Sequence, residues 1–255
     1  MTCMTNILYN TCYLSHFTSF APTNHENLFS LKNKLKQMTV RAVFYKNRYF
    51  FIPYATCLLV ALMLLLIYSK SAIHLFINSH YTTVADFLFR YLTTLGSGLF
   101  GAGVGIVFLL VSFRKSLFIF LTWAGSGIFV QILKRVFFPH ALRPVKFFEG
   151  VYNLHLADGV HIRQYFSFPS GHAATAFGLF LCLAIMTRNH GLKLICFVMA
   201  ALVAFSRIYL SQHFLIDICF GSLAGSGFAL LFYFLVFLSE KKWLDRSIIL
   251  FKEKK

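Results

Sequence analysis

The residues best suited to chemistry in this sequence are a histidine and an aspartate, His213 and Asp217, which lie four positions apart. On a helix this spacing places both side chains on one face, so the carboxylate can hold one imidazole nitrogen and leave the other free as a nucleophile. Taken alone, such a pair is more often an ordinary helix contact. Ser206-Arg207 precedes the pair and adds a cation beside the imidazole.

A second polar group, Pro169-Ser170-Gly171-His172, opens a long apolar run. Ser170 is a typical helix N-cap, and this structural interpretation suffices for any single motif of this kind. The same helix start also offers unpaired backbone N–H groups and the positive end of the helix dipole, which together bind anions. Gly171 allows close approach to the backbone, and His172 adds an imidazole that titrates near neutral pH.

Three cations accompany these groups: Lys134, Arg143 and Arg207. Together with one carboxylate and a helix N-terminus, they predict a site of net positive charge that suits a phosphate dianion. The alternative is that each cation extends to lipid headgroups as an interfacial anchor. The two histidines and Asp217 could also form a metal site of two histidines and one carboxylate. The surrounding cations would repel a metal ion, so no metal is expected.

These groups lie at the ends of apolar segments that are long enough to cross a membrane. The chain has 255 residues, of which 58% are hydrophobic and only 13% are charged, so an ordinary soluble domain is excluded. A bilayer core needs about 20 apolar residues per helix. The sequence predicts an all-α bundle of six transmembrane helices, over residues 49–68, 91–113, 116–133, 171–187, 192–205 and 214–238.

The net charge of +16 indicates membrane orientation rather than nucleic-acid binding, because the lysines and arginines gather in alternate connections. They precede the first span, join spans two and three, join spans four and five, and follow the sixth. By the positive-inside rule both termini are cytoplasmic. The connections 69–90, 134–168 and 206–213, and with them the candidate site, then face the extracytoplasmic side.

The chain divides into a cytoplasmic N-terminal tail (1–48), a six-span domain (49–238) and a basic C-terminal tail (239–255). The first forty residues lack a secretory signal, and Met38 is an alternative start. Cysteines show no CxxC pairing, so neither a disulfide framework nor a zinc site is expected. Glycines four apart, at 101 and 105 and at 221 and 225, predict close helix packing. Residues 69–90 are expected to lie along the interface as a partly amphipathic helix.

Read together, the polar groups resemble the three signature motifs of the type 2 phosphatidic acid phosphatase (PAP2) family, in the superfamily that includes the vanadium haloperoxidases. The second group and the Arg207-His213-Asp217 group match their motifs fully, and the resemblance covers about residues 90–238. The first motif departs from the pattern, which has six residues between its lysine and its Arg-Pro pair. Eight follow Lys134 and seven follow Arg135 before Arg143. The loop must bulge, and Arg135 is an alternative to Lys134.

The resemblance implies a phosphatase that needs no metal and no cofactor and acts through a phosphohistidine on His213, which Asp217 orients. His172 would protonate the leaving group. The phosphate oxygens would bind Lys134, Arg143, Ser170, Gly171 and Arg207. A vanadate-dependent peroxidase is an alternative, although such relatives are soluble. A non-catalytic membrane protein that binds a lipid phosphate is another.

The expected substrate is a lipid phosphomonoester or diphosphate whose tail stays among the membrane lipids. Phosphatidate, phosphatidylglycerophosphate, a polyprenyl diphosphate and a phosphate of lipid A are all candidates, and the sequence indicates neither a choice among them nor an oligomeric state. The small six-span design favours a bacterial inner (plasma) membrane. Phenylalanines of the long loop (137, 138, 147, 148, 166 and 168) could wall the lipid tail or form an ordinary aromatic belt.

Overall fold

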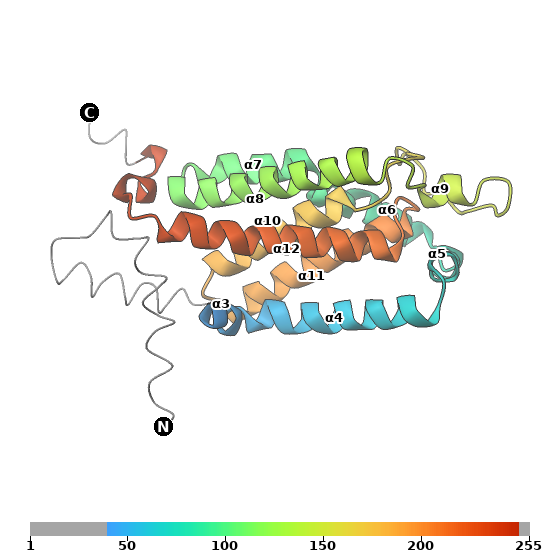
Figure 1. The fold of residues 1–255 in the computed structure, drawn as a ribbon, viewed down its shortest axis with the longest axis horizontal. Coiled ribbons are helices and arrows are strands. Elements are labelled where there is room, and N and C mark those ends of the chain that lie inside the picture. Colours follow the sequence, from blue (N-terminus) through green and yellow to red (C-terminus); the bar gives the residue numbers. More distant parts are fainter. Residues whose placement is uncertain (1–39, 250–255) are drawn as a thin grey trace, which may run out of the picture. The chain divides into compact units, whose positions relative to one another are not determined.

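The structure is a computed structural model that describes residues 40–249, and every regular element in this range is a helix. The compact unit that begins at Phe44 contains all the elements discussed below apart from the start of α3 (Val40–Lys46), and its helices run side by side in Figure 1. Among residues 40–249 there is no strand, which confirms the all-α prediction there. Residues 1–39 and 250–255, with Met38 and most of the predicted N-terminal tail, lie outside the described range.

Four helices are long and apolar enough to cross a membrane. They are α4 (Arg48–Ile67), α8 (Phe113–Ile132), α11 (His190–Tyr209) and α12 (Leu215–Leu238). Each overlaps a predicted span, and the ends differ because hydropathy does not detect caps. The start of α11 is an example, since the Asn189 side chain accepts a hydrogen bond from the Leu192 N–H at 3.1 Å.

The second predicted span, 91–113, differs from the structure because it is not one straight helix. α6 (Thr83–Leu92) passes through a 3-10 turn into α7 (Gly98–Phe108), and the two halves are bent by 55°. Ser97 caps α7 by accepting a hydrogen bond from the Phe100 N–H at 3.2 Å. A Cβ on Gly96 would lie 2.7 Å from Val203 and 3.0 Å from the His172 carbonyl oxygen. A glycine is therefore needed where the bend packs against α10 and α11.

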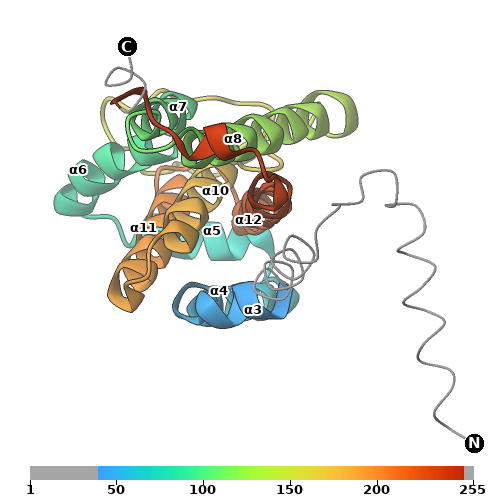
Figure 2. The ribbon, with the colours of Figure 1, turned by 90° about the vertical axis from the view of Figure 1, so that its left-hand side faces the viewer.

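The predicted fourth span is the inner helix α10 (Gly171–Met186), which has only 16 residues. At about 1.5 Å per residue it is about 24 Å long, less than the roughly 30 Å of a bilayer core. It packs against α8, α11 and α12, and Figure 2, which looks along the helices, shows it between them. Residues 40–249 thus hold four candidate spans, or five with α6–α7 as one, besides this shorter helix. The count of six stays a prediction.

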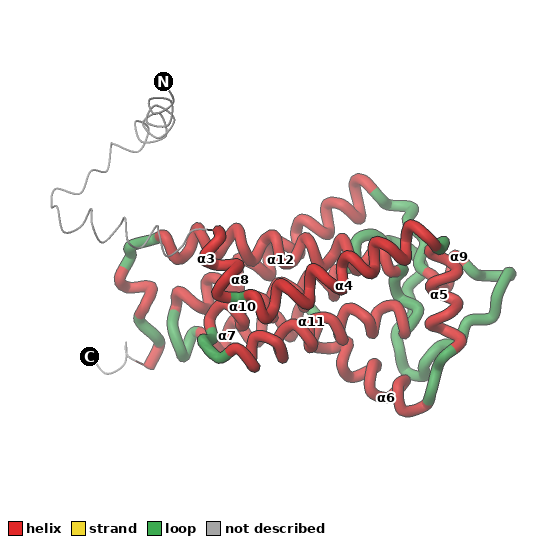
Figure 3. The backbone as a smooth tube through the Cα atoms, turned by 90° about the horizontal axis from the view of Figure 1, so that it is seen from below, coloured by secondary structure: helices red, strands yellow, loops and turns green. Residues whose placement is uncertain are grey.

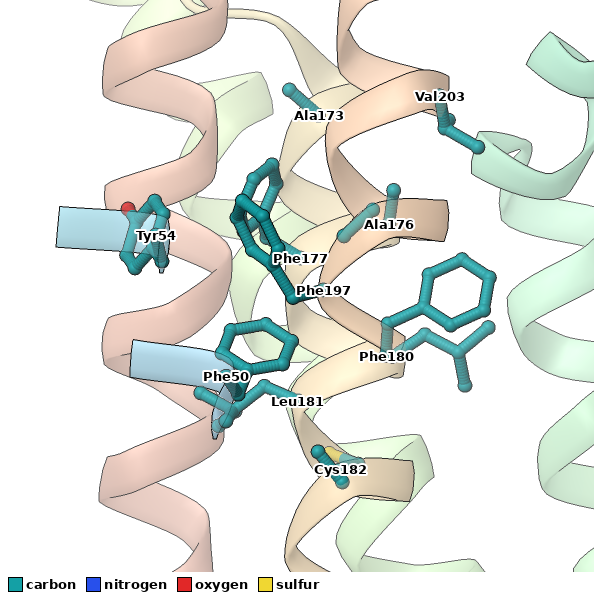
Figure 4. Close-up of a cluster of buried hydrophobic side chains, with 14 of the residues drawn as sticks. Phe50, Tyr54, Ala173, Ala176, Phe177, Phe180, Leu181, Cys182, Phe197 and Val203 are labelled. Carbon is teal, nitrogen blue, oxygen red and sulfur yellow. The ribbon is translucent and has the colours of Figure 1, made fainter. Parts of the chain in front are cut away.

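Aromatic side chains fill the core where α4, α10 and α11 meet (Figure 4). The ring centroid of Phe50 is 6.4 Å from that of Phe177 and 5.9 Å from that of Phe197, and both pairs are edge to face. Tyr54 continues the cluster, with its ring 4.9 Å from Phe177 and its hydroxyl 3.1 Å from Ser222 Oγ of α12. These contacts fix α10 against α4, α11 and α12.

A glycine seam brings the backbones of α10 and α12 together. A Cβ on Gly221 would lie 2.4 Å from the Ser170 carbonyl oxygen, and one on Gly225 would lie 2.1 Å from the Ala174 carbonyl oxygen. The predicted close packing at this pair of glycines is confirmed. The seam ends at Ser170, so it also fixes the N-terminus of α10.

The longest connections lie at one end of the bundle, shown by the green segments in Figure 3. They include the segment between α8 and α10, which carries the short helix α9 (Pro144–Phe147), and the stretch with α5 (Lys70–Ser79). The predicted helix over 69–90 is two helices, α5 and most of α6, capped by the Ser69 and Thr82 hydroxyls. The N-termini of α10 and α12 and the C-terminus of α11 lie at this same end (Figure 1).

Basic residues at the opposite end are built into the fold. Arg114 of α8 is buried and donates to both carboxylate oxygens of Asp245, at 2.6 and 3.0 Å. It also donates to three backbone carbonyl oxygens, those of Val236, Ser239 and Lys241. Lys193 of α11 is buried against Asn47 Oδ1 and the Ala184 carbonyl oxygen. Both cations thus hold helix ends together at this end of the bundle.

Candidate active site

His213 and Asp217 are in contact where α11 connects to α12. His213 Nδ1 lies 3.3 Å from Asp217 Oδ2, and both side chains are buried. Asp217 is in the first turn of α12, whereas His213 lies just before that helix rather than on it. Contact through Nδ1 leaves Nε2 without a carboxylate, and His213 lines the main cavity of the described chain. This is the orientation that a nucleophilic imidazole needs.

Two further groups hold the Asp217 carboxylate. Ser167 Oγ donates to Asp217 Oδ2 at 2.5 Å and lies 3.4 Å from His213 Nδ1. The Phe214 N–H donates to the same oxygen at 3.0 Å, which caps α12. The sequence analysis did not find Ser167, because nothing in the local pattern shows that this loop residue reaches α12.

Arg143 and Arg207 come from different elements and meet at the same glutamine. Arg143 is buried and donates from Nε to the Tyr165 carbonyl oxygen at 3.0 Å and from Nη1 to Gln212 Oε1 at 2.9 Å. Arg207 donates from Nη1 to Thr93 Oγ1 at 2.8 Å and from Nη2 to Gln212 Oε1 at 3.4 Å. Within residues 40–249 the buried Arg207 Nε has no hydrogen-bond partner.

Gln212 is therefore a site residue that the sequence analysis missed. It is 1% exposed, lines the cavity beside His213 and bridges two guanidinium groups through one amide oxygen. An uncharged bridge orients both cations without neutralising either one. Its position next to His213 in the sequence was the only available signal.

Lys134, not Arg135, is the buried cation of the first motif. Lys134 is 6% exposed, and its Nζ donates to the Phe166 carbonyl oxygen at 2.8 Å. Arg135 is exposed at the edge of the cavity. Both lie in a π-helical turn, Leu133–Phe137, that continues α8. A π turn takes up an extra residue, so it accommodates part of the added length of this motif.

The second motif is split between a cap and the cavity. Ser170 is fully buried, and its Oγ accepts a hydrogen bond from the Ala173 N–H at 3.4 Å, as expected for the N-cap of α10. Its own N–H donates to the Asp217 carbonyl oxygen at 2.9 Å, which ties α10 to α12. Gly171 and His172 line the cavity, and Ser170 is not among the lining residues of the described chain.

The cavity has a volume of about 920 Å³ and joins the three motifs. It brings together six of the eight predicted site residues: Lys134, Arg143, Gly171, His172, Arg207 and His213. Asp217 lies behind His213, and Ser170 lies behind Gly171. Among the described residues that line it there is no Asp or Glu, so the cavity is strongly positive.

The apolar wall of the cavity is not the one the sequence suggested. It comes largely from one face of α8, with Trp123, Ala124, Gly127, Ile128 and Val130. None of the loop phenylalanines is among the described lining residues. Phe168 packs against Phe138 and Phe220, and Phe147 packs against Phe148 and Phe214. Phe148 is buried, whereas Phe137, Phe138, Phe147 and Phe166 are exposed.

Burial and the surrounding charges set the protonation of the site. Burial lowers the pKa of His213 well below its usual range, and the charges of Arg143, Lys134 and Arg207 lower it further. Burial, followed by the charge of Arg163, lowers the pKa of Arg143 to about 10. At neutral pH the His213 imidazole is therefore neutral while Arg143 keeps its charge.

This is a helical membrane protein with a cation-lined cavity that a neutral histidine faces. Residues 115–241, close to half of the chain, match the family model of the PAP2 superfamily. The chain belongs to the PAP2 superfamily. No curated protein sequence matches it.

Two solved structures are similar to this chain. Aquifex aeolicus LpxE shares 25% sequence identity, with a TM-score of 0.56, over 64% of this chain and 93% of that one. A transmembrane PAP2 type phosphatidylglycerolphosphate phosphatase from Bacillus subtilis shares 23% identity, with a TM-score of 0.49, over 75% of this chain and 94% of that one. The chain thus shares its fold with Aquifex aeolicus LpxE over 64% of its length.

Proposed function

We propose that this protein is an integral-membrane phosphatase that hydrolyses a lipid phosphomonoester or diphosphate through a phosphohistidine on His213, with no metal. One observation carries the proposal. A neutral imidazole, held from behind by Asp217, faces a cavity lined by the buried cations Lys134, Arg143 and Arg207, and no carboxylate lines that cavity among the described residues. Such a cavity suits a substrate with two negative charges.

The first step transfers the phosphoryl group to His213. The Nε2 lone pair forms a bond to phosphorus, the bond from phosphorus to the leaving oxygen breaks, and His172 gives that oxygen a proton. His172 can hold this proton only with substrate bound, because the phosphate dianion then offsets the surrounding cations that otherwise keep the imidazole neutral. The three cations and the Gly171 N–H bind the non-bridging oxygens, which supplies electrostatic stabilisation. Ser170 supports this site by capping α10, since its Oγ accepts a hydrogen bond from the Ala173 N–H behind the cavity.

The second step releases phosphate. His172, now neutral, takes a proton from a water molecule, the water oxygen bonds to phosphorus, and the bond to His213 breaks. His213 returns to its neutral form, and Asp217 stabilises the positive imidazole that exists in the intermediate. Both histidines line the same cavity, as this exchange of roles needs.

A lipid substrate is favoured by the apolar wall. The cavity continues from the cations along the face of α8 that carries Trp123 and Ile128. α8 is itself long enough to span a bilayer. A phosphate headgroup and the start of its tail therefore fit one continuous space. Membership of the PAP2 superfamily supports the same conclusion.

We also propose that the site faces the extracytoplasmic side of a bacterial inner membrane and that both termini are cytoplasmic. Basic residues at the other end of the bundle, such as the half-buried Lys115 and the exposed Arg188, support this orientation. A reporter fused after Lys255 is expected in the cytoplasm, and one inserted in 150–160 outside it. The opposite pattern would invert the proposed orientation.

The proposal is tested by phosphate release in detergent with EDTA, over phosphatidate, phosphatidylglycerophosphate, a polyprenyl diphosphate and a lipid A phosphate. We expect turnover of at least one lipid, and alkaline quenching of the reaction should trap phosphate on His213. Strict dependence on added divalent metal would contradict the mechanism. Phosphate binding without release would indicate a non-catalytic binder, and halide oxidation with vanadate a peroxidase.

A further inference from the structure

The cavity carries more positive charge than one phosphate needs. Besides the three motif cations, three arginines outside the motifs line it: Arg90, Arg135 and Arg163. No Asp or Glu faces them from the described lining residues. A phosphomonoester brings at most about two negative charges at neutral pH. The surplus cations therefore need another explanation.

Arg163 is held in place by the site itself. His161, two residues before it, accepts a hydrogen bond from Gln212 Nε2 at 3.4 Å through its carbonyl oxygen. Gln164, directly after it, accepts one from the Arg143 N–H at 2.8 Å. The backbone on both sides of Arg163 is thus fixed by two residues of the phosphate cavity, and the exposed Arg163 side chain lines that cavity.

Arg90 approaches the same cavity from α6. Its Nη1 donates to the Asp158 carbonyl oxygen at 3.1 Å, and its guanidinium lies over Gly159. A Cβ on Gly159 would lie 2.5 Å from Arg90 Cζ, and Gly159 has a φ of +71°. The positive φ favours glycine there, and a side chain at this position would push the Arg90 guanidinium aside. The loop that precedes Arg163 therefore leaves room for a second guanidinium.

We propose that the substrate headgroup carries a second phosphate group next to the reacting one, and that Arg163, assisted by Arg90, binds it. This inference rests on the proposed phosphatase function. Arginine presents a fork of N–H donors that matches phosphate oxygens. The two phosphates can be joined directly, as in a lipid diphosphate, or separated, as in a phosphomonoester and a phosphodiester on one headgroup. In both cases a lipid with a single phosphate is the poorer substrate.

The test compares kcat/KM for four lipids: a polyprenyl diphosphate, phosphatidylglycerophosphate, and for each of them a monophosphate with the same tail. Arg163→Gln is expected to lower kcat/KM at least about 10-fold for a lipid with two phosphates and by less than about 3-fold for its monophosphate, since one charge-assisted contact is lost. Arg163→Lys should recover part of this loss. A larger loss of kcat/KM for the polyprenyl diphosphate indicates joined phosphates, and a larger loss for phosphatidylglycerophosphate indicates separated ones.

Lys146→Gln is the matched control, because Lys146 is a cation of the same connection that pairs with Glu149 and does not line the cavity. It should leave all rates unchanged. Equal losses on both lipid classes in Arg163→Gln, no loss, or faster turnover of monophosphates by the wild type would each overturn the inference. In those cases phosphatase activity persists, so the proposed function stands.

Binding supplies a readout that does not depend on turnover. In His213→Ala, inorganic diphosphate should raise the melting temperature more than inorganic phosphate at equal concentration, and Arg163→Gln should remove the difference. An equal shift with both anions would contradict a second phosphate subsite. If no lipid is hydrolysed, the proposed function fails, while this binding difference still tests the subsite.

Discussion

Buried cations occur at both ends of the bundle, but their partners differ. Arg114 has a carboxylate partner, Asp245, and three backbone carbonyl oxygens. At the other end Arg207 is equally buried, and among residues 40–249 it forms no ion pair and leaves Nε without a partner. A buried charge without a counter-charge is costly. The partners of a buried cation, rather than its burial, therefore separate an anchor from an anion site.

The largest effect is expected from removing the nucleophile at the site end. His213→Ala should lower phosphate release by about 10⁴-fold or more, because no other group can form the covalent intermediate. Melting temperature should change little, which shows that the fold persists. A residual rate within about 10-fold of wild type would make the contact between His213 and Asp217 structural.

Exchanging the two arginines for glutamine tests the comparison itself. Arg207→Gln should lower kcat/KM by about 10²–10³-fold, as expected for one group that stabilises transition-state charge, with little loss of stability. Arg114→Gln should leave kcat/KM within about 3-fold and destabilise the protein by about 1–3 kcal/mol, because buried carbonyls lose their donor. Steady-state rates and denaturant unfolding measure both. The reverse pattern would refute the assignment of anchor and site.

A third pair of variants tests whether the glycine seam between α10 and α12 supports the site. Gly225→Ala places a methyl group against the Ala174 carbonyl oxygen and should cost about 1–3 kcal/mol and lower activity, because α10 and α12 must separate. Gly227, on the same helix, has nothing within 4 Å of its would-be Cβ. Gly227→Ala should be neutral or slightly stabilising. Equal stability of the two variants would show that the seam does not matter.

The last prediction concerns the pH dependence of stability. It depends on His74, a buried histidine at the same end of the bundle as the site. Burial lowers the pKa of His74 on α5 to about 4, below the value of about 6.5 in the unfolded chain. The unfolded state therefore takes up the proton first, and stability is lost as pH falls from 6.5 towards 4. At pH 5 the loss is about 2 kcal/mol relative to pH 8.

Unfolding of wild type and His74→Gln over pH 5–8 measures this contribution. The variant should have the flatter stability profile, and His80→Gln, at the exposed end of the same helix, should behave like wild type. Parallel profiles for wild type and His74→Gln would contradict the assignment of a buried neutral imidazole.

Much of the site follows from the sequence because its residues stand at helix ends. The spacing of His213 and Asp217 predicted their contact, and hydropathy placed α8, α10, α11 and α12 so that the motifs converge at one end. Ser170 illustrates the limit of such reasoning, since one residue type suits both a cap and an anion ligand. The structure shows the cap directly.

The rest depended on contacts between distant segments. Ser167 and Gln212 act on Asp217, Arg143 and Arg207 only after separate connections fold together, so no local period marks them. Lys134 is buried and Arg135 exposed within one π-helical turn, and spacing alone reveals neither the turn nor this difference in burial. The bend at Gly96 was hidden for a related reason, because hydropathy measures apolar content rather than direction.

The most direct test of the anion site is a calorimetric titration of the purified protein with inorganic phosphate in EDTA, for wild type, Arg207→Gln and Arg114→Gln. We predict one phosphate per chain at the tightest site of the wild type, unchanged affinity of that site in Arg114→Gln, and affinity at least about 10-fold weaker in Arg207→Gln. Equal affinity in all three proteins, or binding only when a divalent metal is added, would contradict the account.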